Sequence, residues 1–301
     1  MLTSLEALRE RFQFSAWLPV EGPLSDELHK RNIPIVDFSI HGAGNKLGPE
    51  EVAERLRSLI AHHSPDLLHA NSLSMSRMMG SAGHDIAIPI TGHIRDIMKL
   101  SRKAVEDLTR LEKLVAVSQA TADFHHQQGL PDEKLTVIHN GIDLELFQPR
   151  EPTSLRSELG LSESTILIGS IGQICLRKGF DLLPRVAARL ECVANDIHFC
   201  LVGERYSSKQ ESVDYDSALD IEFERLGLTA HFHRLGFRND VPHLMNEFDV
   251  LLHPARQEPL GRVLLEAAAS GCPIVATHVG GTPEIVTHED SALLFPVDDV
   301  E

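Results

Sequence analysis

The sequence predicts an α/β fold with two Rossmann-like domains, whose parallel sheets face a common cleft. Three observations predict it. Short apolar runs alternate with helical patterns along the chain. They form two series, separated near residue 150 by a stretch that contains Pro149 and Pro152. The chain has 301 residues, 42% of them hydrophobic, which is enough for two buried cores. Apolar strands with helices between them favour parallel sheets that are covered on both faces.

The expected elements divide the chain into an N-terminal domain, residues 1–150, and a C-terminal domain, residues 151–301. The apolar runs that read as strands are Phe14–Val20, Ile33–Phe38, Leu67–Ala70, Ala87–Thr91, Leu114–Val117, Thr136–His139, Ile166–Ile171, Ile197–Val202, His231–Leu235, Val250–His253, Ile274–Thr277 and Leu293–Phe295. Helical patterns cover Leu2–Arg11, Glu50–His62, Thr121–Gln128, Leu182–Cys192 and Ser217–Leu226.

Composition limits the class of protein. The formal net charge is −16, which argues against a nucleic-acid partner. Residues 1–150 carry 16 basic and 20 acidic side chains, whereas residues 151–301 carry 12 and 24, so the N-terminal half is the one expected to approach an anionic surface. The four cysteines show no paired spacing and read as reduced core residues of a cytoplasmic protein. Neither a membrane span nor a signal peptide is visible.

Two carboxylates flank the expected start of a helix near the C-terminal end. Seven residues separate Glu258 from Glu266, and Gly261 marks the loop-to-helix junction before a helical run at residues 263–269. A helix N-terminus offers free N–H groups to a phosphate. Because like charge repels, the two glutamates are better suited to accept hydroxyl groups on either side of it. A diphosphate between two hydroxyl-rich groups describes a nucleotide sugar. The alternative is that Glu258 caps the helix and Glu266 is solvated.

A group of residues with a matching chemistry follows the first expected strand of the C-terminal domain. Gly172 permits close backbone approach, and Arg177 and Lys178 place two adjacent cations at the strand's carboxyl end, where open α/β sheets bind ligands. A solvated Arg-Lys pair is the alternative interpretation. The Gly-x-Gly-x-x-Gly dinucleotide pattern and the Gly-Lys-Ser/Thr phosphate loop are both absent from the sequence. Gly203 and Phe237 follow later strands, and Phe237 is placed to flank a base, although the glycine also suits a simple tight turn.

Histidines give one further candidate. His93 is expected directly after the strand at residues 87–91, facing the cleft. The pairs His62-His63 and His125-His126 read as helix surface. No metal site is predicted, because no His-Glu-x-x-His pattern or other cluster with metal-ligand spacing occurs in the sequence.

Taken together, these residues resemble the retaining glycosyltransferases of family 4, which have the two-domain GT-B architecture. The resemblance extends in order from about residue 60 to the end. Its motifs are Pro65-Asp66-Leu-Leu-His69-Ala, Thr91-Gly-His93, Val117-Ser118, Asn140-Gly141-Ile-Asp143, Phe147-Gln-Pro149, Gly172-x5-Lys178-Gly179, Leu201-Val-Gly203, Leu235-Gly236, Asp240-Val241-Pro242, Pro254, Glu258-x7-Glu266-Ala, Gly271-x-Pro273-Ile-Val-Ala and Gly280-Gly-x-x-Glu284-Ile-Val.

The resemblance implies transfer of a sugar from a nucleotide-diphosphate sugar to an acceptor hydroxyl, with retention and without a required metal or other cofactor. It implies a glycan, a lipid-linked molecule or a small molecule as acceptor, and a location in the cytoplasm or at the inner face of the membrane, with the N-terminal domain as the candidate for peripheral contact. The implied roles are Lys178 on the donor diphosphate, Glu258 on sugar hydroxyls, Glu266 on the ribose, the Leu260 and Gly261 N–H groups on phosphate or sugar, and His93 reaching the donor from the opposite domain.

The chain departs from the family pattern in two ways. Gln173 stands where the family usually has Arg, so we expect either weaker phosphate binding or substitution by Arg177. The segment Leu2–Arg11 looks like the helix that follows the family's first strand and Gly-rich loop, and the chain stops before the usual C-terminal helices. We therefore expect a competent donor half and a compromised acceptor half, which upstream sequence would restore. A fragment that binds donor but is catalytically impaired, and a nucleotide-sugar epimerase on the same architecture, are the alternatives.

Overall fold

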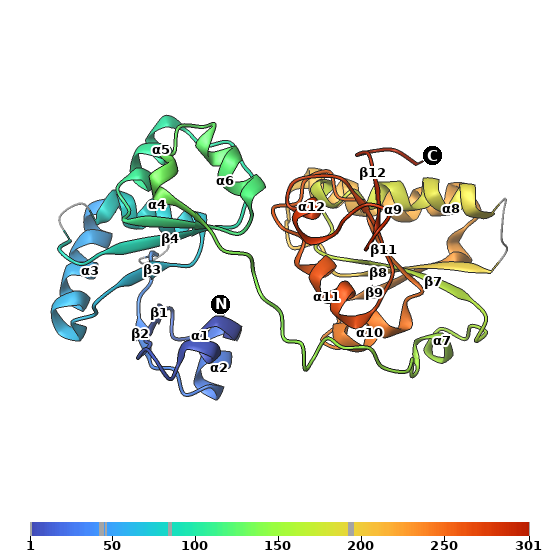
Figure 1. The fold of residues 1–301 in the computed structure, drawn as a ribbon, viewed down its shortest axis with the longest axis horizontal. Helices are drawn as coiled ribbons and strands as arrows, with labels where there is room; N and C mark the ends of the chain where they lie inside the picture. The colour runs from blue at the N-terminus through green and yellow to red at the C-terminus, as the bar shows by residue number, and fades with distance from the viewer. Residues whose placement is uncertain (1, 42–44, 46, 84–85, 192–195, 301) are drawn as a thin grey trace. The chain divides into compact units, whose positions relative to one another are not determined.

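The computed structural model describes residues 2–41, 45, 47–83, 86–191 and 196–300. These residues form two compact units (Figure 1). The first comprises Met1–Ala116 and Phe124–Gly141, and the second comprises Val117–Asp123 and Ile142–Glu301. Each is α/β with parallel sheets, as the sequence predicts.

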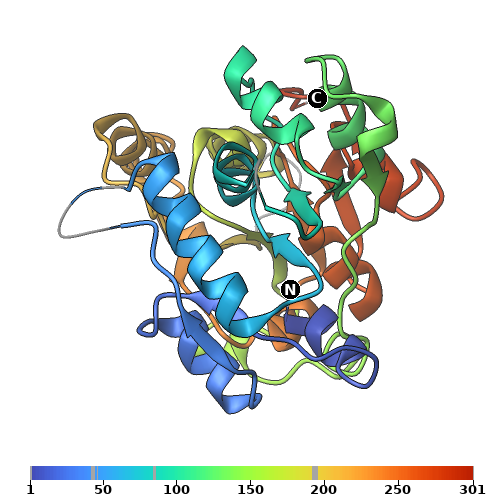
Figure 2. The same ribbon diagram turned by 90° about the vertical axis from the view of Figure 1, so that its left-hand side faces the viewer.

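The first unit contains two parallel sheets. Strands β1 (Ala16–Leu18) and β2 (Ile35–Asp37) form one, and β3 (Leu68–Ala70), β4 (Ile90–Ile94), β5 (Lys113–Ala116) and β6 (Leu135–Val137) form the other, paired in that order. The α-helices up to residue 126 are α1 (Leu2–Leu8), α2 (Pro23–Lys30), α3 (Pro49–His63), α4 (Leu73–Ala82), α5 (Arg102–Thr109) and α6 (Gln119–His126). Helix α3, the longest of these, is the azure helix of Figure 2. Residues 119–123 of α6 belong to the second unit.

The second unit contains one six-stranded parallel sheet with the order β12-β11-β10-β7-β8-β9. Its strands are β7 (Ile166–Ile171), β8 (Ile197–Val202), β9 (Phe232–Gly236), β10 (Val250–His253), β11 (Ile274–Thr277) and β12 (Leu293–Phe295). Its helices are α7 (Leu155–Glu158), α8 (Leu183–Glu191), α9 (Gln210–Arg225), α10 (Val241–Glu247), α11 (Arg262–Ser270) and α12 (Thr282–Ile285). From β7 the chain builds outward to β9, then returns to the other side of β7 with β10. The strand order therefore reverses between β7 and β10, which makes their carboxyl ends the expected ligand crevice.

Both faces of this sheet are covered. Helices α8 and α9 lie on one side and α10 and α11 on the other (Figure 1). Neighbouring residues of a strand enter opposite cores: Leu167 packs with the cluster that contains Leu264, and Ile168 packs with the cluster that contains Phe223. Burial on both sides explains why these strands appear in the sequence as continuous apolar runs.

Most of the expected strands of the second unit are confirmed, and β7, β8, β10, β11 and β12 have the predicted bounds. In the first unit the prediction for residues 87–91 is wrong, because strand β4 covers Ile90–Ile94. The predicted range included Pro89, which has no N–H to donate to a sheet ladder, and β4 begins after it. His93 therefore lies inside a strand rather than after one.

The burial of His125 and of Cys175 differs from what the sequence predicts. His125 was expected on a helix surface, but it is buried with 0% exposure, and its Nε2 lies 2.8 Å from the carbonyl oxygen of Asp96. Cys200 and Cys272 are buried and in no disulfide among the described residues, as expected of reduced core cysteines, whereas Cys175 is only half-buried. Cys192, at the end of one expected helix, lies outside the described residues.

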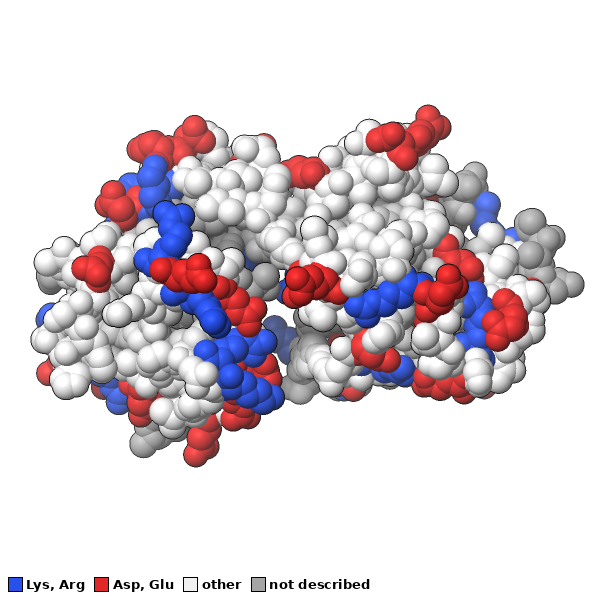
Figure 3. All heavy atoms as spheres, turned by 60° about the horizontal axis from the view of Figure 1, so that its bottom comes forward, with Lys and Arg blue, Asp and Glu red and all other residues white. Residues whose placement is uncertain are grey.

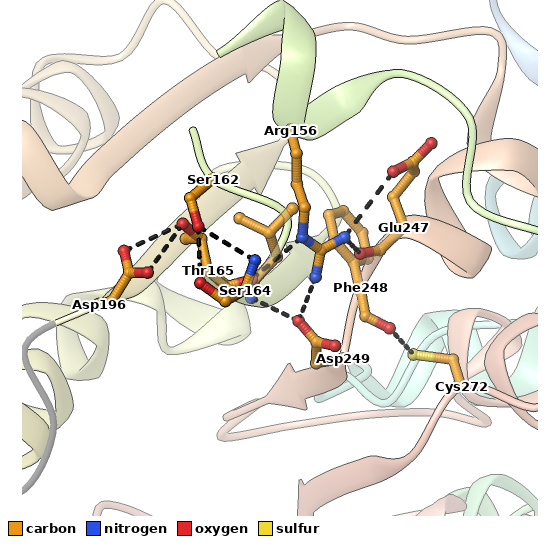
Figure 4. A network of polar contacts seen from close by, with 10 residues as sticks. Arg156, Ser162, Ser164, Thr165, Asp196, Glu247, Phe248, Asp249 and Cys272 are labelled. Atoms are coloured by element: carbon orange, nitrogen blue, oxygen red, sulfur yellow. Dashed lines mark hydrogen bonds and ion pairs between the residues drawn. The ribbon is translucent and has the colours of Figure 1, made fainter. Parts of the chain in front are cut away.

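A buried arginine organises the entry into the second unit (Figure 4). Arg156 is 9% exposed; it donates to the carbonyl oxygens of Thr165 and Glu247, both at 3.0 Å, and to the Asp249 carboxylate at 2.6 Å. The Asp249 carboxylate also accepts the Leu167 N–H at 2.7 Å. One guanidinium thus ties α7 to the amino ends of β7 and β10, the two strands that define the crevice.

We expect Arg156→Met to lower the free energy of unfolding by about 2–3 kcal/mol, because it leaves the buried carbonyls and Asp249 without their donor. Urea denaturation followed by circular dichroism measures this change. Arg225→Met is the matched control, since Arg225 lies on the same unit with a 63% exposed side chain and a local pair to Glu222. We expect no measurable change there, and an equal loss in both variants would contradict the role of Arg156.

Candidate active site

In the second unit, the loops that follow β7 and β10 lie in contact at the sheet edge where a ligand crevice is expected. Lys178 ends a short 3-10 helix in the first loop, and Glu258 lies in the second. Gly179, with φ of 68°, follows Lys178, and a Cβ there would lie 1.9 Å from the Pro254 carbonyl oxygen. Only glycine therefore lets the two loops approach this closely. Because β7 and β10 are neighbours in the sheet, the loops that follow them bring Lys178 and Glu258 side by side.

Lys178, Glu258 and His253 form a buried cluster at this point. The Lys178 Nζ lies 2.6 Å from Glu258 Oε2, and the His253 Nε2 lies 2.8 Å from the same oxygen. Lys178, Glu258 and His253 are 9%, 5% and 1% exposed. Glu258 therefore neither caps helix α11 nor faces solvent, which removes the alternative interpretation of this residue.

The surroundings of the cluster fix its charges. Burial opposes the ionised form of Glu258, but the hydrogen bond from His253 and the charge of Lys178 outweigh it and hold the pKa of Glu258 well below its usual value. Burial lowers the pKa of His253, and the charge of Lys178 lowers it further, although Glu258 opposes both effects. At neutral pH the cluster is thus a carboxylate between an ammonium group and a neutral imidazole.

Arg256 connects the loop after β10 to the loop after β7. Its guanidinium binds both oxygens of Asp181, at 2.6 and 2.7 Å, and its Nε donates to Asp298 at 2.7 Å. Its backbone N–H also donates to the Arg177 carbonyl oxygen at 2.9 Å. Arg256, Asp181 and His253 are not among the site residues predicted from the sequence. Proximity in sequence to Lys178 and Glu258 was the only signal for them.

The backbone near Glu258 is held from the other side by two glycines. A Cβ on Gly280 would lie 2.0 Å from the Glu258 carbonyl oxygen, and the Gly281 N–H donates to that oxygen at 2.9 Å. Helix α11 then starts after Gly261, the predicted junction, which has φ of 95°. Among the described residues, the N–H groups of Leu260 and Gly261 donate to no protein acceptor. The start of α11 therefore presents free donors close to the Lys178 cluster.

Glu266 lies on α11 with 14% of its side chain exposed, and pairs with Arg262 at 3.1 Å. Burial raises the pKa of Glu266, and Arg262 opposes this only in part. It is therefore not a solvated surface carboxylate, and its assignment to a ribose remains a prediction.

The other donor-side candidates lie along the same sheet edge. A Cβ on Gly203 would lie 2.0 Å from the Gly172 carbonyl oxygen, so the loops after β7 and β8 are also in close contact. Gln173 is exposed and Arg177 is half-buried. Gly203 borders a hollow of about 280 Å³ whose other lining residues include Glu204, Arg234 and Gly236. Phe237, 58% exposed, follows this lining, and its N–H donates to Glu204 at 3.4 Å.

His93 belongs to the first unit. Its Nε2 is buried and has no hydrogen-bond partner among the described residues. Its ring lies 5.9 Å from that of His69, and the backbone N–H of His93 donates to the Ser76 hydroxyl at 3.2 Å. Burial, aided by the charge of Arg95, lowers the pKa of His93 to about 4. The imidazole is therefore neutral at physiological pH and keeps one nitrogen available.

The face drawn in Figure 3 gives no sign of a charged binding surface, and the described residues give no sign of a metal site. On the face drawn in Figure 3, Lys and Arg side chains are interleaved with Asp and Glu. In the part of the chain that the structure describes, no three His, Cys, Asp or Glu side chains converge in a way that could hold a metal ion. Within the same residues, no helix combines the length and the apolar character needed to cross a membrane.

Known proteins are similar to this chain in fold and in sequence. The structure superimposes on that of Anabaena Alr3699/HepE in complex with UDP and glucose with a TM-score of 0.85 and 27% identity, covering 99% of this chain and 82% of that one. The same protein in complex with UDP-glucose gives a TM-score of 0.84, with 98% of this chain and 80% of that one covered. The fold is that of the GT-B glycosyltransferases.

Sequence comparison gives the family. Residues 5–146 match the model of Glycosyltransferase Family 4, and residues 153–301 match that of Glycosyl transferases group 1. The chain belongs to the family 4 type of glycosyltransferases. It is 28% identical to N-acetyl-alpha-D-glucosaminyl L-malate synthase of Bacillus anthracis over 83% of this chain and 64% of that protein. It is 30% identical to the lipopolysaccharide core biosynthesis mannosyltransferase LpsB of Rhizobium meliloti over 64% and 54%. The chain thus spans between half and two thirds of the length of these relatives, whose names do not favour the epimerase alternative.

The environment of His93 gives a prediction about pH. Its pKa of about 4 lies below the ordinary 6.5, so the stability that neutral His93 contributes is present above pH 6.5 and is lost as pH falls through about 4. Proton NMR of the imidazole should show His93 titrating near pH 4. Arg95→Gln should raise this pKa by removing a positive charge, whereas Arg102→Gln, with a 94% exposed side chain, should not. A wild-type midpoint near 6.5 would contradict the burial argument.

Proposed function

We propose that this protein transfers a sugar from a nucleotide-diphosphate sugar to an acceptor hydroxyl, with retention at the anomeric carbon and without a bound metal. One observation carries the proposal: Lys178, Glu258 and the start of α11 meet at the carboxyl ends of β7 and β10. An ammonium group and free N–H donors suit a diphosphate, and a buried ionised carboxylate suits sugar hydroxyls.

Sugar transfer requires stabilisation of the leaving diphosphate. Negative charge develops on the diphosphate as the bond to the anomeric carbon breaks, so a positioned cation is worth most there. Lys178 supplies that charge from a buried position, where it is screened little by water. The N–H groups of Leu260 and Gly261 add fixed dipoles. This division leaves Glu258 to orient the sugar rather than to contact phosphate.

The substrates are proposed at the level of class. Structures of the 27% identical Anabaena protein contain UDP and UDP-glucose, which supports a nucleoside diphosphate donor. Relatives are named for malate and for lipopolysaccharide, which supports a small-molecule, glycan or lipid-linked acceptor. We also propose that the N-terminal domain makes the contact with a lipid-linked acceptor at the inner face of a membrane. Proton NMR of the product, read at the anomeric position, tests retention.

Lys178→Met should reduce donor turnover by about 100-fold, because it removes the positive charge from the developing diphosphate while keeping the length of the side chain. Turnover is measured as UDP release from UDP-glucose with a panel of sugar, polyol and lipid acceptors. Lys209→Met, at an exposed lysine of the same unit, is the control and should keep full activity. Addition of EDTA should leave wild-type turnover unchanged. Equal activity of the two variants would refute the phosphate assignment, and loss of activity in EDTA would refute metal independence.

The two glutamates should separate binding from turnover. Glu266→Gln should weaken the binding of free UDP, because it removes a charged acceptor from the ribose hydroxyls. Glu258→Gln should leave UDP affinity within about twofold and reduce turnover of UDP-glucose, because the sugar is present only in the intact donor. Isothermal titration calorimetry with UDP and the turnover assay measure the two effects. If both variants weaken UDP equally, the assigned division of roles is wrong.

A further inference from the structure

His253 is a buried titratable residue that the proposed roles do not use. It is the last residue of β10, at the crevice where the strand order reverses, and it is 1% exposed. Its Nε2 approaches Glu258 Oε2 at 2.8 Å. A carboxylate only accepts hydrogen bonds, so His253 donates and carries its proton on Nε2.

Hydrogen bonds fix the backbone near the contact between His253 and Glu258. Thr277, on the neighbouring strand β11, donates to the Ala255 carbonyl oxygen at 2.5 Å. The Gly281 N–H holds the Glu258 carbonyl oxygen at 2.9 Å. With the loop fixed at these points, the remaining freedom of Glu258 lies in its own side-chain torsions. The contacts at its carboxylate therefore decide where it points.

The two donors to Glu258 Oε2 differ in what they can do. Lys178 is a flexible side chain with four carbon–carbon torsions, and its charge is assigned to the diphosphate under the proposed function. Once the donor binds, the ammonium group is shared with, or drawn toward, an anion of higher charge. His253 is neutral and held by a strand in the middle of the sheet, so its N–H stays in place.

We propose that His253 is a positioning residue that holds Glu258 in its sugar-binding orientation when Lys178 engages the donor diphosphate. This inference rests on the proposed function. It adds to the site a fixed, uncharged donor, so that the carboxylate keeps one partner in both the free and the donor-bound enzyme. On this proposal, the Lys178–Glu258 ion pair is the arrangement of the donor-free enzyme, and donor binding separates the two side chains.

A pair of substitutions of matched shape tests the proposal. His253→Gln places an amide N–H donor near the position of Nε2, whereas His253→Met has similar size and no donor. With UDP-glucose, we expect kcat of the Met variant to fall at least tenfold below that of the Gln variant, while the UDP dissociation constant changes less than threefold in both. His198→Met is the control, because His198 is another buried histidine of this sheet, near the amino end of β8, bonded to His233 at 2.8 Å.

The outcomes separate the inference from the proposed function. If the wild type shows no donor turnover, the proposed function fails. If it turns over and the Gln and Met variants have equal kcat, or if His198→Met loses as much kcat as His253→Met, then the positioning role is refuted. Nitrogen-15 NMR of the imidazole gives a readout that needs no turnover. We expect the Nε2–H tautomer for His253 in the free and UDP-bound protein, and the Nδ1–H tautomer would overturn the proposal.

Discussion

The buried ion pair between Lys178 and Glu258 is the interaction on which the site depends. Removing two charges from water is costly, and a buried pair is often no more stable than apolar residues of the same volume. Stability alone therefore gives no reason to keep it. The pair becomes useful when one partner has a second, stronger anion to meet. A cation that is already desolvated and positioned needs little reorganisation when charge develops beside it.

That pair exists only because two loops distant in sequence are brought into contact. The reversal of strand order makes β7 and β10 neighbours. Gly179 and Gly280 then let backbone approach backbone at distances that no side chain would permit. Arg256, through Asp181, locks the result with charged hydrogen bonds. The strand order, the two glycines and the Arg256–Asp181 contact thus all help to position Lys178 and Glu258.

The sequence allowed the sheets and the main charged residues to be predicted, but not how the side chains pair. Strands β7, β8 and β10 are buried on both faces, so they appear as uninterrupted apolar runs with clear ends. Strand β4 was misplaced because Pro89 lies within an apolar run without being able to join the ladder. His253 looked like one more strand residue. Its contact with Glu258 depends on the course of a loop, which a local pattern does not encode.

The two glutamates of the motif show how environment creates chemical difference. Both are partly or fully buried, and burial alone would raise the pKa of each. At Glu258 two N–H donors reverse the effect and keep the carboxylate ionised, whereas at Glu266 one exposed arginine does not. A carboxylate with a lowered pKa is a permanent anion, fit to face a sugar beside a cation. A carboxylate whose pKa is raised by burial, as at Glu266, holds its charge at a greater cost, but its oxygens still accept hydroxyl hydrogen bonds. Under the proposed function, these different surroundings suit the two identical side chains to opposite ends of one nucleotide sugar.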